Sequence, residues 1–92
     1  MNGLDSKGFI SEIEVKMVPI APIVEFAIKK QIAEVGATKE LMSPEQAILF
    51  INNMTVDLEL FLGANGARES KKFMTSTLRK YAPDYFEEHS LI

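Results

Sequence analysis

The sequence contains no cysteine, no tryptophan and a single histidine, His89. Without cysteine the chain has neither a disulfide framework nor a thiolate that could act as a nucleophile or metal ligand. A single histidine also excludes the Glu-x-x-His pairs of a di-iron helical bundle. His89 stands near the end of a polar stretch, where we expect a solvated tail. We therefore expect no catalytic site, no cofactor and no metal site.

Long uncharged apolar stretches are absent as well. A membrane-spanning helix needs about 20 consecutive apolar residues, and charged residues interrupt every long apolar stretch of this chain. Residues 1–9 have neither the basic start nor the apolar run of a signal peptide. We expect a cytoplasmic protein that does not associate with membranes.

The 92 residues suffice for one domain near the low end of sizes that fold alone. Hydrophobic residues make up 47% of the chain and charged residues 25%, which is the balance of a globular protein and not of a disordered one. We expect a single domain over residues 1–92, with a frayed polar start at residues 1–8.

The clearest element begins at Ser43. Ser43 followed three residues later by Gln46 forms a capping box, and Pro44 suits the first helical position because its missing N–H has no partner there. Gly63 can take the left-handed conformation that ends a helix. These signals predict a central helix over residues 44–62.

This predicted helix has more apolar residues than one buried face requires. Ala47, Ile51, Met54, Leu58 and Phe61 follow each other at intervals of four and three residues, which is typical of a seam facing one partner helix. Further apolar residues, among them Phe50, Leu60 and Leu62, lie off this seam. The alternatives are a fully covered central helix of a monomeric bundle and a helix that a second chain covers. In the second case we expect the interface at Phe50, Ile51, Met54, Leu58, Phe61 and Leu62.

Two further helices are predicted around it. Residues 21–35 show the periodicity of an amphipathic helix and end at Gly36, and residues 65–82 form a second long helix that stops before Pro83. The short connection between residues 62 and 65 predicts that the two long helices are antiparallel.

The two ends of the chain are less regular. Residues 9–17 fit the alternation of a strand and also a helical spacing; we favour a short helix, because a lone strand would need a partner. Tyr85, Phe86 and Leu91 suggest a short helical tail. The predicted fold is all-α, a bundle of three main helices with short ordered pieces at both ends.

Charge is distributed unevenly. The net charge is −3, but residues 64–82 carry five basic side chains against one acidic side chain. Arg68, Lys71, Lys72 and Arg79 are the candidate contacts for a nucleic acid or another polyanion. The acidic remainder of the chain argues against strong binding, so we regard nucleic acid as an unlikely partner.

These observations favour a non-catalytic protein–protein interaction or oligomerisation module, either a homodimer or a module that docks a helical partner. The first alternative is polyanion binding through the basic helix 65–82. The second is binding of a small apolar ligand, which would need a cavity lined by Met54, Leu58 and Met74. The methionines alone do not favour it, since flexible thioethers are also common core filler.

Overall fold

The computed structural model of the chain describes residues 4–85 and is all-α over that range, as predicted. It contains α1 (Ser6–Met17), α2 (Ile23–Glu34) and α3 (Pro44–Tyr81), and residues 83–85 are also helical. The rest of the predicted C-terminal tail, including His89, lies outside the described residues.

α3 is a helical hairpin whose turn is a single residue. At Gly63 the backbone has φ 75° and ψ 176°, which interrupts the helical path and reverses the chain. This conformation is essentially restricted to glycine. We call residues 44–62 the first arm of α3 and residues 64–81 its second arm. The sequence predicted a second helix from residue 65, but residue 64 already belongs to the second arm because Gly63 alone makes the reversal.

The capping box predicted at the start of α3 is present. The Gln46 backbone N–H donates to Ser43 Oγ at 3.0 Å, and Gln46 Oε1 accepts from the Ser43 backbone N–H at 2.8 Å. Gln46 Nε2 also donates to the Val35 carbonyl at 3.0 Å, which ties the end of α2 to the start of α3. The first arm is therefore fixed at both ends by local chemistry.

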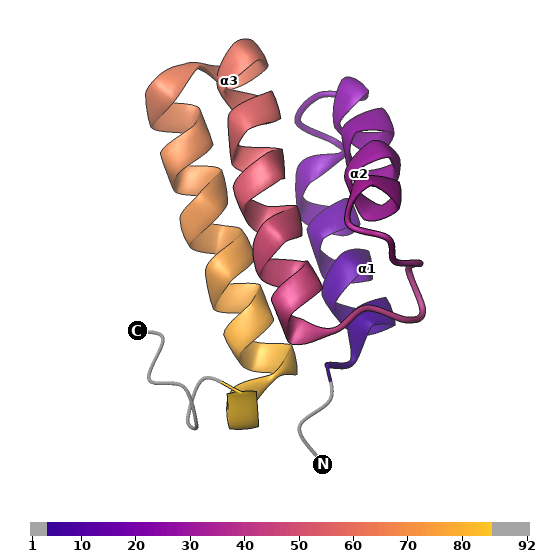
Figure 1. Cartoon of the computed structure of the whole chain (residues 1–92). Helices are drawn as coiled ribbons and strands as arrows, with labels where there is room; N and C mark the ends of the chain where they lie inside the picture. Colours follow the sequence, from indigo (N-terminus) through magenta and orange to yellow (C-terminus); the bar gives the residue numbers. More distant parts are fainter. Residues whose placement is uncertain (1–3, 86–92) are drawn as a thin grey trace.

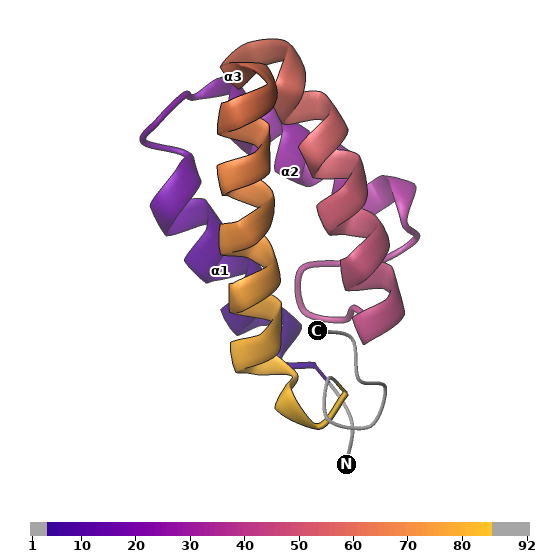
Figure 2. The ribbon, with the colours of Figure 1, turned by 90° about the vertical axis from the view of Figure 1, so that its left-hand side faces the viewer.

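The helices form two layers (Figure 1). The two antiparallel arms of α3 make one layer, and α1 and α2 make the other. Turning the molecule shows α1 beside the second arm and α2 beside the first arm (Figure 2). The second arm therefore packs against α1, whereas the first arm packs against α2 and also contacts α1 through Phe9.

α1 settles the ambiguity of residues 9–17, which are helical. Asp5 caps this helix, because its side-chain Oδ1 accepts a hydrogen bond from the Gly8 N–H at 3.1 Å. Ordered helix thus begins at Ser6, inside the stretch 1–8 where the composition suggested fraying.

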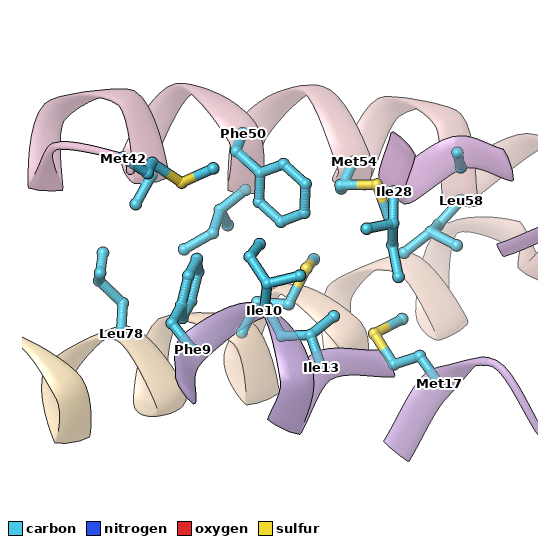
Figure 3. Close-up of a cluster of buried hydrophobic side chains, with 14 of the residues drawn as sticks. Phe9, Ile10, Ile13, Met17, Ile28, Met42, Phe50, Met54, Leu58 and Leu78 are labelled. Carbon is cyan, nitrogen blue, oxygen red and sulfur yellow. The ribbon is translucent and has the colours of Figure 1, made fainter. Parts of the chain in front are cut away.

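The core lies at the centre of the bundle, where side chains of the first arm and α2 meet those of α1 and the second arm (Figure 3). The rings of Phe9 and Phe50 meet edge to face with their centroids 6.1 Å apart, which joins α1 to the first arm. The larger side chains of the core are Phe9, Ile10, Ile13 and Met17 from α1, Val24 and Ile28 from α2, and Phe50, Met54, Leu58, Met74 and Leu78 from α3. All of them are almost completely shielded from solvent.

α1 is also held to the second arm by polar contacts. Glu12 Oε1 accepts from Lys80 Nζ at 2.9 Å and from Tyr81 Oη at 2.8 Å. These two donors hold the pKa of Glu12 below its usual value, the hydrogen bond from Lys80 having the larger effect. Gly8 makes the approach of Tyr81 possible, since a Cβ there would stand 2.6 Å from the tyrosine ring.

Candidate interaction surface

Most of the interface residues expected from the sequence belong to the core instead. Phe50, Ile51, Met54 and Leu58 point into the chain's own interior and are buried there. The interface assignment therefore needs correction at these four positions. The physical reason is that α1 and α2 cover this side of the first arm, and Phe9 of α1 covers Phe50 in particular.

The remaining two expected interface residues lie at the end of the first arm. Phe61 keeps about half of its surface exposed (53%), whereas Leu62 is half-buried against the core. Phe61 is therefore the one member of the expected set that offers a large apolar surface to a partner.

A surface groove between α2 and the first arm contains Phe61. Its volume is about 410 Å³, and we call it the apolar groove. It is lined by Ile23, Phe26, Ala27, Lys30, Asp57, Leu60 and Phe61. α2 supplies one wall and the first arm supplies the other.

The apolar side chains of this groove stand out into solvent. Phe26 is 70% exposed and Leu60 is 81% exposed, and Ile23 is 42% exposed. Small-molecule pockets bury most of their ligand and hold their apolar side chains in a concave wall. Protruding side chains of this size are typical of a surface that a macromolecule covers.

Each wall of the groove also carries one charged residue. Lys30 lines the α2 wall and Asp57 lines the wall of the first arm. Gln31, the neighbour of Lys30, is buried and its Nε2 donates to Asp57 Oδ2 at 2.8 Å. This hydrogen bond fixes the position of the Asp57 carboxylate and places Lys30 and Asp57 at the same level along the helices.

The outer face of the first arm extends the apolar surface. Leu49, Val56 and Leu60 follow each other at intervals of seven and four residues, which places them on one stripe of the helix. All three are more than half exposed. The sequence predicted more apolar circumference on this helix than its own chain covers, and the exposed residues are these three together with Phe61.

The second arm presents a basic surface. Arg68, Lys71 and Lys72 line a shallow depression with Thr75 and Ser76, and Arg79 is exposed further along the same arm. Lys72 Nζ lies 3.5 Å from Glu69, and Arg68 Nη1 donates to Asn65 Oδ1 at 3.2 Å. The four predicted polyanion contacts are thus all on one arm, and three of them share one depression.

The described residues do not group into a metal site. Within residues 4–85 no three histidine, aspartate or glutamate side chains come close enough together to hold an ion. Met54, Leu58 and Met74, the expected lining of a ligand cavity, are fully buried among other core side chains.

α3 resembles a membrane-spanning helix in length and composition alone. One 18-residue window of this helix is apolar enough to cross a bilayer. In the folded chain the first arm uses its apolar residues in two ways, since Phe50, Met54 and Leu58 fill the core while Val56 and Leu60 face solvent. The core helix of a globular protein can have the same length and composition.

Comparisons with protein-family models, with curated proteins and with solved structures each gave no match.

The sequence alone did not indicate that one surface contains Ile23, Phe26, Lys30, Asp57 and Leu60. Two features of the sequence are consistent with this surface. Phe26 lies outside the buried stripe of α2, which is formed by Val24, Ala27 and Ile28. Leu60 belongs to an apolar stripe on the side of the first arm opposite the predicted seam.

Proposed function

We propose that this chain is a non-catalytic protein–protein interaction module whose binding surface is the apolar groove. The observation that supports it is the exposure of four large apolar side chains, Ile23, Phe26, Leu60 and Phe61, around one groove. Covering each of them would contribute roughly 1.5–3 kcal/mol of hydrophobic free energy before the entropic cost of association.

A protein partner fits this surface better than a lipid surface does. Helices that lie in a membrane interface carry Lys and Arg beside their apolar face. Here the groove is lined by one basic residue, Lys30 on α2, and the first arm carries Asp57 and Glu59. Protein interfaces accept an apolar centre bordered by charges of both signs.

The test is the mass of the assembly in solution, measured by light scattering behind a sizing column. We expect the wild-type chain to form an assembly of more than one chain. The double substitution Phe26→Ser with Leu60→Ser should reduce the assembly to single chains while the helical circular dichroism spectrum is retained, because both side chains are exposed and contribute little to the monomer.

Val15→Ser is the matched control. Val15 is also a large exposed side chain (77%), but it lies on α1 and does not line the groove. The control variant should keep the wild-type mass. Equal masses for the wild type and the groove variant would contradict the assignment of the groove. Retention of the wild type on lipid vesicles that is lost in the groove variant would assign the same surface to a membrane.

A further inference from the structure

We infer that the occupant of the apolar groove is a second copy of this chain, related by a two-fold axis that runs parallel to the helices. This inference rests on the proposed function and names the partner of the same site. The reason is the complementarity of the two walls.

At one position along the helices, the two walls of the groove carry opposite charges. Lys30 on α2 and Asp57 on the first arm are level because the adjacent Gln31 is hydrogen-bonded to Asp57. Within residues 4–85 Lys30 has no carboxylate at salt-bridge distance. Asp57 accepts its hydrogen bond from an uncharged amide. Both charges are therefore available for a partner.

A two-fold axis parallel to the helices exchanges the walls without changing their level. It places α2 of one copy over the first arm of the other, so that Lys30 of each copy faces Asp57 of the other. The same operation brings Phe26 of α2 opposite the Leu60 region of the first arm. Every contact occurs twice, which is the defining property of an isologous interface.

The axis perpendicular to the helices and lying in the same face does not achieve this match. It would place α2 over α2 with the direction reversed, so that Lys30 of each copy faces α2 of the other copy and not Asp57. The lysine ammonium would then be covered without the Asp57 counter-charge, which is unfavourable. The charged pair therefore selects one of the two arrangements.

Charge reversal tests the arrangement. Lys30→Glu alone places two pairs of like charges in the dimer, and so does Asp57→Lys alone. We expect each variant to weaken self-association at least about tenfold, because juxtaposed like charges are strongly disfavoured at an interface. An equimolar mixture of the two variants should associate again as a heterodimer, since both of its cross-chain pairs are then Glu with Lys or Lys with Asp. Native mass spectrometry identifies this species directly.

Two controls protect the result from a folding artefact. Asp57→Asn keeps an oxygen that can accept from Gln31 and removes only the charge, so it should weaken association less than Asp57→Lys. The chain that carries both Lys30→Glu and Asp57→Lys should form a homodimer by itself, because both pairs are restored with reversed polarity. Thermal unfolding of each variant at low concentration shows whether the single chain is folded.

The outcomes separate this inference from the proposed function. If the wild-type chain is a trimer or a larger assembly that the Phe26→Ser, Leu60→Ser variant disrupts, the groove remains the interface and the two-fold arrangement is wrong. The same holds if the wild type is a dimer but the mixture of Lys30→Glu and Asp57→Lys does not form heterodimers. A wild-type chain that stays monomeric overturns both.

Discussion

The two arms of α3 share one inward pattern and have opposite outward surfaces. Both direct large apolar residues into the core, Leu58 from the first arm and Leu78 from the second. On the outside, the first arm presents the apolar stripe that includes Val56 and Leu60, whereas the second arm presents the basic depression around Lys71. One hairpin therefore carries two chemically different faces.

This difference separates the residues that determine the fold from the residues that we propose for association. The inward residues of both arms are apolar because each arm packs against the opposite layer. The outward residues are not constrained by that packing, so their chemistry is free to serve a partner. An apolar outward face is the exception among solvent-exposed helices and calls for an explanation, whereas a charged outward face is ordinary.

The largest expected effect contrasts two leucines of the first arm. Leu58→Ala should lower the free energy of unfolding by about 2–5 kcal/mol, because it removes a fully buried side chain and leaves a cavity. Leu60→Ala, two residues away and exposed, should change the stability of the single chain by less than about 0.5 kcal/mol. Urea unfolding at a concentration low enough to keep the chain monomeric measures both values.

The two leucine variants also test which residues of the first arm belong to the core and which belong to the surface. A cost below about 1 kcal/mol for Leu58→Ala would mean that the inward face of the first arm is misassigned. A large cost for Leu60→Ala at low concentration would mean that Leu60 contributes to the fold and not to association.

The next effect concerns the turn that divides the arms. Gly63→Ala should destabilise the chain by about 1–3 kcal/mol, because alanine at φ 75° and ψ 176° is strained. Space is not the reason, since a Cβ at this position would meet nothing within 4 Å. Ala64→Ser, at the adjacent exposed helical position, is the control and should be nearly neutral. Equal stability of the two variants would show that the turn tolerates a side chain.

The elements that the sequence predicted correctly have local causes. The Ser43 and Gln46 capping box involves residues three positions apart, and the turn at Gly63 depends on one residue. Such features are readable from a short stretch because the interacting groups are fixed by the stretch itself. The bounds of the two arms followed from them.

The candidate interaction surface depends on contacts between distant segments, and the prediction from the sequence missed it. Phe50 was expected at an interface because it lies off the seam of the first arm. It is buried because Phe9, more than forty residues earlier in the chain, packs against it. The spacing of residues 9–17 suited a strand and a helix alike, so the sequence could not show which side of the first arm α1 would cover. The apolar groove can be located only when the side of the first arm that α1 covers is known.

The basic surface of the second arm should contribute little to binding. We expect its affinity for duplex DNA at physiological salt to be no tighter than nonspecific binding, with a dissociation constant weaker than about 10⁻⁴ M. Any retention at low salt should weaken further in the Arg68→Ala, Lys72→Ala variant. Fluorescence anisotropy with a labelled duplex, titrated at several salt concentrations, measures this. Tight, sequence-dependent binding at physiological salt would transfer the functional assignment from the first arm to the second.

The smallest expected effect is the pH dependence that Glu12 confers on the contact between α1 and the second arm. The hydrogen bonds from Lys80 and Tyr81 lower the pKa of Glu12 below 4.5, so its contribution to stability is present above that value and is lost as the pH falls through the lowered pKa. Its hydrogen bond raises the pKa of Lys80 and that of Tyr81, so at alkaline pH the contribution is lost as these two groups deprotonate. The variant Glu12→Gln tests this contribution, because it keeps an acceptor oxygen and removes the charge.

The melting temperature of Glu12→Gln should lie slightly below that of the wild type at neutral pH, and the two melting temperatures should converge in acid. Glu59→Gln, on the first arm, provides the control for the general loss of a carboxylate. A difference between wild type and Glu12→Gln that persists unchanged well below pH 4.5 would mean that the ionised carboxylate does not stabilise this contact.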